Sequence, residues 1–181
     1  QAEILSESKN FPITNSRIDL TMSAPTQASD KTTLIYYVSS GSTGLDPGYD
    51  AGAYIAGIPS FGLYTYLVNN NQDILFQVQA LSDENYENAA VPLSVYAPLN
   101  TQLTFSATTI SLPDVKVFIE DRFNRTVHEV GDGNTFQITV TEAMTGEEGR
   151  FYMHTCKVAW LGTTNTDWNT ASNWSSNTVP G

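Results

Sequence analysis

Two aspartates in a glycine-rich stretch could hold a metal ion. Asp46 and Asp50 stand four residues apart in the run Asp-Pro-Gly-Tyr-Asp-Ala-Gly at positions 46–52. Calcium takes about six to eight oxygen ligands, and such a loop can add backbone carbonyls to two carboxylates. The spacing differs from that of an EF-hand loop, which needs acids at alternate positions and a closing Glu. Two interpretations follow: a calcium site at Asp46 and Asp50, or a loop whose acids cap turns.

Aromatic residues gather around the same stretch. They are Tyr36, Tyr37, Tyr49, Tyr54, Phe61, Tyr64 and Tyr66. Exposed tyrosines on a rigid edge can stack a sugar ring or anchor a protein partner, and on this basis Tyr49 and Tyr54 are candidate ligand-binding residues. Tyrosine and phenylalanine also fill the core of many β-sheet proteins, so core packing is the alternative interpretation.

The remaining reactive side chains do not predict catalysis. Neighbouring acids such as Glu120 and Asp121 point to opposite faces of a strand, whereas a glycosidase needs two carboxyls facing each other across a cleft. His128 and His154 lie in separate alternating segments and could meet across a sheet face to hold zinc. Cys156 lies only two residues beyond His154, which does not match the spacing of Cys–His catalytic motifs. We expect no catalytic residue and no enzyme activity.

Charge and hydropathy exclude two classes of partner. The chain has 8 Lys and Arg against 19 Asp and Glu, a formal net charge of −11 over 181 residues. This charge repels phosphate backbones, so nucleic-acid binding is not expected. No apolar run reaches the roughly 18 residues of a membrane helix, so direct membrane insertion is not expected. The single cysteine rules out an internal disulfide framework.

Period-two alternation of apolar and polar residues dominates the chain, as in Ile18, Leu20 and Met22. Strands are predicted at 18–22, 33–38, 63–68, 74–81, 91–96, 103–110, 115–120, 126–130, 136–140 and 151–158. Short strands with turn residues between them predict an all-β fold, an antiparallel β-sandwich with jelly-roll-like or Ig-like wiring. The glycine-rich stretch 39–60 interrupts the alternation and is predicted to be a long irregular loop, where binding tends to occur.

The tryptophans predict a second unit at the end of the chain. Trp160, Trp168 and Trp174 are the only tryptophans, and they crowd into a tail rich in Asn, Thr and Ser. A globular domain normally spreads such large side chains through its core. We therefore expect a sandwich module over 1–159, and a linker or the start of a truncated Trp-rich repeat module over 160–181.

Several short motifs are more informative in their order than singly. The strand at 117–122 reads Val-Phe-Ile-Glu-Asp-Arg and is followed by Gly-Arg-Phe-Tyr-Met-His at 149–154. Upstream lie Arg-Ile-Asp-Leu at 17–20, Gly-Tyr-Asp-Ala-Gly at 48–52 and Val-Pro-Leu at 91–93. Together they resemble β-sandwich modules of large secreted Bacteroidota proteins, of the Flavobacterium and Cytophaga type. The tail resembles the Trp-Gly, Asp-Trp and Asn-Trp repeats of the same surface proteins.

The resemblance implies a module of a secreted or bacterial cell-surface protein, typically cargo of the type IX secretion system. It implies adhesion, gliding-type surface attachment or a spacer role, with surface glycans or other cell-surface or secretion proteins as partners. Three alternatives remain open: a carbohydrate-binding module that uses the 39–60 loop with calcium, an accessory domain of an exported hydrolase, or a filament subunit joined by strand exchange.

One structural role also follows from the motif residues. Arg150 is expected to form an ion pair with Glu120, Asp121 or Glu148, which would tie the last hairpin to the preceding strand. We predict that the Glu-Asp pair is structural rather than catalytic.

Overall fold

The computed structural model describes residues 16–55, 57–70, 73–84, 89–157, 162–167 and 169–174. Within these residues the secondary structure is twelve β-strands and one 3-10 turn, so the predicted all-β fold is confirmed. The elements are β1 (Arg17–Ser23), β2 (Lys31–Val38), β3 (Ala51–Gly52), β4 (Gly62–Thr65), β5 (Phe76–Ser82), β6 (Val91–Ala97), β7 (Gln102–Ile110), β8 (Val115–Asp121), β9 (Thr126–Val130), β10 (Phe136–Thr139), β11 (Met144–Thr145), β12 (Phe151–Lys157) and η1 (Ala171–Asn173).

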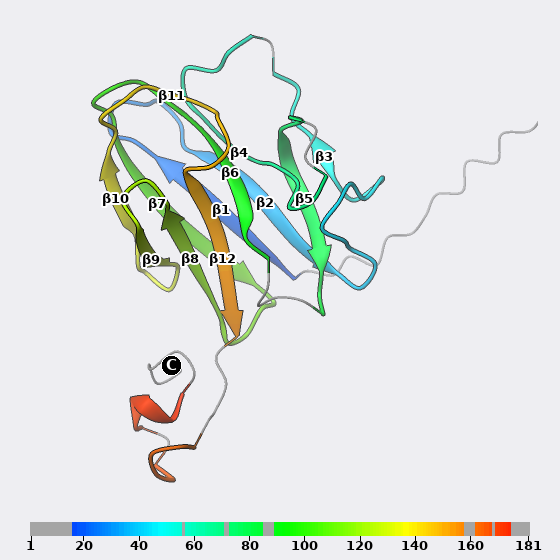
Figure 1. Ribbon diagram of the computed structural model, residues 1–181, viewed down its shortest axis with the longest axis vertical. Helices are drawn as coiled ribbons and strands as arrows, with labels where there is room; N and C mark the ends of the chain where they lie inside the picture. Colours follow the sequence, from blue (N-terminus) through cyan, green and yellow to red (C-terminus); the bar gives the residue numbers. More distant parts are fainter. Residues whose placement is uncertain are drawn as a thin grey trace, which may run out of the picture.

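The strands form one nearly closed, barrel-like sheet in the order β10-β7-β1-β2-β5-β4-β6-β12-β8-β9, with β3 on β5 and β11 on β6. β4 and β5 are joined only by the pair Thr65↔Phe76, and the sheet folds over at this corner. As a result, β12 and β6 lie in front of β1 and β2 (Figure 1).

The sandwich prediction needs one correction, because the pairing is not antiparallel throughout. β2 and β5 run parallel, from Leu34↔Val78 to Val38↔Ser82. Parallel neighbours need a long crossover connection, and the segment between Val38 and Phe76 supplies it. The predicted loop at 39–60 is therefore the first part of this crossover.

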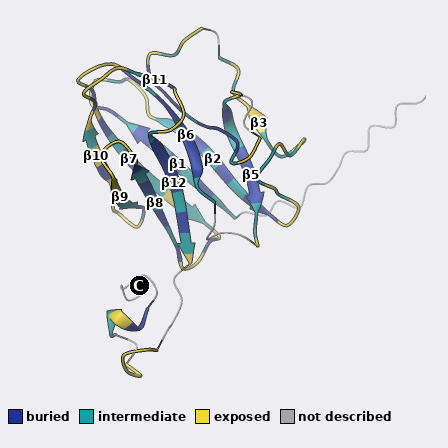
Figure 2. Ribbon diagram, viewed as in Figure 1, coloured by how far each residue is buried: buried dark blue, intermediate teal, exposed yellow. Residues whose placement is uncertain are grey.

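The alternation in the sequence corresponds to burial in the structure. In β1 every second residue is buried, and Ile18, Leu20 and Met22 are fully enclosed. The two layers meet through aromatic rings, since Phe105 of β7 and Phe151 of β12 have ring centroids 5.4 Å apart. Figure 2 shows the buried positions concentrated in the strands.

The ends of the sheet face each other across a seam between β9 and β10. The two strands are joined by a tight turn in which Asp132 and Gly133 both have positive φ angles, 51° and 87°. β9 nevertheless stays paired with β8, and β10 with β7. The rings of His128 and Phe136 stack across the seam with centroids 4.1 Å apart, which covers the gap with aromatic surface.

Two buried polar side chains in the described part of the chain have no hydrogen-bond partner. They are Thr65, through Oγ1, and Gln79, through both Nε2 and Oε1, and each residue is 0% exposed. Gln79 pairs with Ile35 in the parallel ladder. Paired residues project from the same face of a sheet, so the Gln79 amide points into the core.

Gln79→Met is expected to raise the free energy of unfolding by about 1–2 kcal/mol, because it removes an unpaired buried amide and keeps the side-chain volume. Gln77→Met provides the matched control, since the Gln77 amide donates to the Thr32 carbonyl, and we expect it to be neutral or destabilising. Urea unfolding of the three proteins checks this. A loss of stability in Gln79→Met would show that the Gln79 amide has hydrogen-bond partners in solution.

The tail folds around one asparagine. The Asn173 side chain is buried; its Oδ1 accepts N–H donors from Thr164 at 2.9 Å and Asn165 at 3.1 Å, and its Nδ2 donates to Asn165 Oδ1 and to the Asp167 carbonyl. Trp174 is also buried. The predicted boundary near residue 160, together with Trp160 and Trp168, lies outside the described residues.

Candidate functional site

Asp46 and Asp50, the two predicted calcium ligands, accept hydrogen bonds at all four carboxylate oxygens. Asp46 accepts the Ser42 N–H at 2.6 Å and the Ser42 hydroxyl at 2.9 Å. Asp50 accepts the Asp46 N–H and the Ala80 N–H, each at 2.7 Å. The acids thus cap the turn that they lie in, which is what the alternative interpretation expected.

Asp50 also protects a sheet edge. β3 pairs with β5 at Phe76 and Val78. Next along the same edge of β5, the Ala80 N–H donates a hydrogen bond to the Asp50 carboxylate. An uncovered strand edge is a template for unwanted pairing, and natural proteins commonly cover such edges. Burial raises the pKa of Asp50, and the two backbone N–H groups oppose that rise by stabilising the charged form.

Calcium binding at this loop stays a prediction, and the described residues contain no group of three or more His, Cys, Asp or Glu that could hold a metal. An ion at Asp46 and Asp50 would have to share these oxygens with the donors named above or displace them. The turn-capping interpretation predicts that thermal melts in calcium and in chelator coincide. A site filled at a hundred times its dissociation constant would instead stabilise the protein by about 2.7 kcal/mol.

The candidate tyrosines Tyr49 and Tyr54 do not come together in a pocket. Tyr54 is 97% exposed, whereas Tyr49 is half-buried and accepts a hydrogen bond from the Ser40 hydroxyl at 3.1 Å. Of the other aromatics in this cluster, Tyr37, Phe61 and Tyr66 are buried, as the core interpretation predicted. Ligand binding by Tyr49 and Tyr54 stays a prediction.

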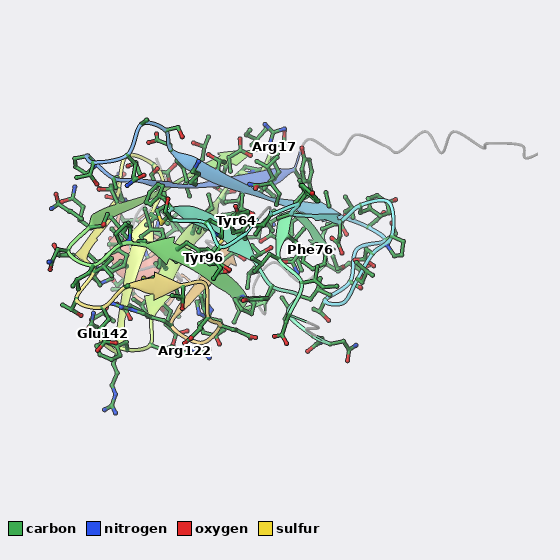
Figure 3. All side chains as sticks on the ribbon, turned by 90° about the horizontal axis from the view of Figure 1, so that it is seen from above. Arg17, Tyr64, Phe76, Tyr96, Arg122 and Glu142 are labelled. Carbon is green, nitrogen blue, oxygen red and sulfur yellow. The ribbon has the colours of Figure 1, made fainter. Side chains whose placement is uncertain are left out.

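A surface pocket lies elsewhere, between the β8–β9 turn and the loops that flank β11. Its volume is about 430 Å³, within the usual range of ligand pockets of about 300–1,000 Å³. It is lined by Arg122, Phe123, Thr141, Glu142, Ala143, Met144, Thr145, Glu147, Glu148, Gly149 and Arg150. Figure 3 labels Arg122 and Glu142, one from each wall.

The first wall is built on Asp121, which is 0% exposed. Its carboxylate accepts the backbone N–H groups of Phe123 at 3.0 Å and Asn124 at 3.3 Å, and the Asn124 side-chain amide at 2.9 Å. Arg150 adds two donors, Nε at 3.2 Å and Nη2 at 3.1 Å. Five donors on one buried carboxylate fix the shape of the turn at 121–124.

The same network presents an aromatic ring to solvent. Phe123 is 66% exposed, and the Arg150 guanidinium lies 5.1 Å from its ring centroid. A bidentate Arg–carboxylate pair has little freedom to move. Contact with the fixed Arg150 guanidinium therefore restricts the motion of the Phe123 ring. The predicted ion pair of Arg150 is thus confirmed, with Asp121 as its partner.

Glu120 has different partners on the outer face of the sheet. Its Oε2 lies 2.8 Å from His154 Nε2 and 3.2 Å from Arg122 Nε. These bonds, His154 first, lower the pKa of Glu120. The Arg122 guanidinium also lies 3.4 Å from the ring centroid of Tyr152.

The two histidines do not meet. His128 pairs with Ile119 and shares its inward face, whereas His154 pairs with Phe118 on the outward face. The zinc interpretation required both on one face, and the register places them on opposite sides of the sheet.

The second wall is anchored at Gly146. Its carbonyl accepts the Tyr66 hydroxyl at 2.7 Å and the Ser94 hydroxyl at 2.8 Å, and its N–H donates to the Val95 carbonyl. Gly146 lies against the ring of Tyr96 with φ +87°, where an added Cβ would overlap that ring. Burial raises the pKa of Tyr66. Figure 3 shows Tyr96 beside Tyr64, whose ring meets it edge-on with centroids 6.1 Å apart.

Sequence reasoning identified Asp121 and Arg150 but missed the pocket that they support. The segment 141–149 reads only as turn residues, and its position over the outer face of β6 depends on contacts with distant strands. One local signal was available: Phe123 lies in a polar turn between two arginines, where a large apolar residue has no core to enter.

Fold and site together define a nearly closed all-β module with a surface pocket whose two walls are held by Asp121 and Gly146. No protein-family model, curated protein or solved structure matches the chain. The described residues include no helix with the length and apolarity that a membrane crossing needs.

Proposed function

We propose that this chain is a non-enzymatic recognition module of a larger secreted or cell-surface protein, and that it binds a surface glycan in the pocket between Phe123 and the 141–149 loop. One observation carries the proposal: a 66% exposed aromatic ring stands on a turn held by five hydrogen bonds, at the mouth of a pocket of about 430 Å³. Adhesion through such a site agrees with the resemblance to surface proteins.

Rigidity supports the proposal physically. Binding loses affinity when side chains or loops must become ordered, at about 0.5–1.5 kcal/mol for each immobilised side chain. Here Asp121 orders one wall and Gly146 the other before any ligand arrives. A large exposed apolar residue that is held in place without packing is a typical feature of a recognition surface.

The chemistry of the lining favours binding over hydrolysis. Glu142, Glu147 and Glu148 are all exposed, whereas a general acid of a glycosidase needs a desolvated carboxyl with a raised pKa. The arginines of the pocket are already paired with carboxylates. The lining therefore provides contacts and hydrogen bonds for a ligand.

A glycan array with the whole chain tests the proposal. We expect specific glycans to bind, and Phe123→Ala to lose that binding. Val127→Ala is the matched control, because Val127 is 61% exposed on β9 and does not line the pocket. A blank array would contradict glycan recognition and favour the spacer role.

A further inference from the structure

We infer that the pocket selects a hydroxyl-rich saccharide without acidic groups, and that Phe123 is the platform on which one sugar ring stacks. This inference rests on the proposed function and adds the chemical class of the ligand. It follows from the pairing of the two arginines within the protein, from the acidic groups at the rim, and from the position of the aromatic surface.

Both arginines of the pocket form ion pairs with carboxylates of the protein. Arg150 makes a bidentate pair with Asp121, whose side chain is 0% exposed. Arg122 pairs with Glu120 at 3.2 Å and stacks on Tyr152. An anionic ligand at Arg150 would have to compete with the Asp121 carboxylate. Breaking the buried pair of Arg150 would leave the Asp121 charge without its partner, which is costly.

The acidic groups at the rim accept hydrogen bonds and repel anions. Glu142 and Glu147 stand on the loop wall together with the hydroxyls of Thr141 and Thr145, and the Thr145 hydroxyl donates to Glu147 Oε1 at 3.5 Å. Carboxylates and hydroxyls accept bonds from sugar hydroxyls, and the carboxylates repel sulfate, uronate and sialate groups. The formal net charge of −11 adds to that repulsion at long range.

Phe123 supplies the apolar contact that a neutral sugar needs. One face of its ring lies toward the Arg150 guanidinium, and the side chain is 66% exposed, so ring surface remains open to a ligand. The C–H groups on one face of a pyranose can pack on such a ring. Met144, half-buried on the opposite wall, adds a second apolar contact in the pocket.

Calorimetric titration tests the inference with three probes: a neutral glucan or mannan oligosaccharide, an alginate oligosaccharide as the anion and a chitosan oligosaccharide as the cation. We expect the neutral probe to bind and the alginate probe to be excluded. The affinity of the neutral probe should change less than about twofold between low and high salt, because screening acts on charges. Phe123→Ala should weaken binding at least about tenfold, as loss of an aromatic anchor does. Val127→Ala, which lies outside the pocket lining, should leave neutral binding unchanged.

The outcomes separate the inference on sugar class from the proposed function. Binding of the alginate probe, binding of the chitosan probe alone, or a neutral-sugar affinity that falls steeply with salt overturns the inference on sugar class and leaves the proposed function standing. Unchanged binding in Phe123→Ala overturns the assigned platform. Absence of binding to every sugar, on the array and in titration, overturns the proposed function itself. Circular dichroism of each variant shows that a loss of binding is not a loss of fold.

Discussion

Asp121→Asn is expected to lower the free energy of unfolding by about 3 kcal/mol or more. The substitution removes the charge that faces Arg150 and turns an amide N–H₂ toward donors that need an acceptor. Breaking a buried ion pair from one side typically costs about 3–5 kcal/mol, because the partner charge is left uncompensated. The Asp121 side chain is 0% exposed and that of Arg150 is 18% exposed, so solvent can do little to compensate.

Asp132→Asn is the matched control for this experiment. Asp132 also lies near a cation, since its Oδ2 is 3.7 Å from Lys116 Nζ, but its side chain is 69% exposed. Exposed pairs contribute about 0–1 kcal/mol, and asparagine keeps the positive φ of the turn acceptable. Denaturant unfolding of both variants measures the difference. Equal, small losses would mean that Asp121 does not organise the turn.

The second large effect is expected at Gly146. Gly146→Ala should cost about 2–4 kcal/mol, because it combines a positive φ of +87° with a Cβ that overlaps the Tyr96 ring. Relief of the overlap would lift the loop away from Tyr66 and Ser94, whose hydroxyls bind its carbonyl. The same variant should therefore lose glycan binding together with stability.

Gly149→Ala separates sterics from backbone strain in the same loop. Gly149 has φ +118°, but nothing lies within 4 Å of an added Cβ. We expect a cost of about 1 kcal/mol from the backbone alone. If Gly146→Ala and Gly149→Ala proved equally mild in thermal melts, the loop could not be anchored on Tyr96 as described.

Local patterning predicted most of the strands. The run 126–130 became β9, and the run 103–110 became β7 with one added residue. In β7 the alternation matches the burial of Leu103 and Phe105 on one face. The parallel pair β2–β5 was not predictable, since neighbour choice depends on a crossover rather than on the strands themselves. β3 and β11 have two residues each, too few for any pattern.

The candidate site was predictable only where a charge pair suggested it. Asp121 follows the predicted strand 115–120, and Arg150 precedes the predicted strand 151–158. The structure joins these opposite charges. Asp46 and Asp50 suggested calcium because their spacing does not reveal that backbone N–H groups occupy their oxygens. Placement of the pocket depends on Gly146 meeting Tyr96, a contact between segments that share no local pattern.

The wiring of β1 has a consequence for biosynthesis. Among the described residues β1 is the first strand, and it pairs on one side with β7, with Arg17 opposite Ile110, so a nascent chain cannot complete this pair until residue 110 has been made. Folds with such distant pairings reach the native state in about milliseconds to seconds, and their early strands stay prone to aggregation meanwhile. Before β7 emerges, we expect a chaperone to shield this segment.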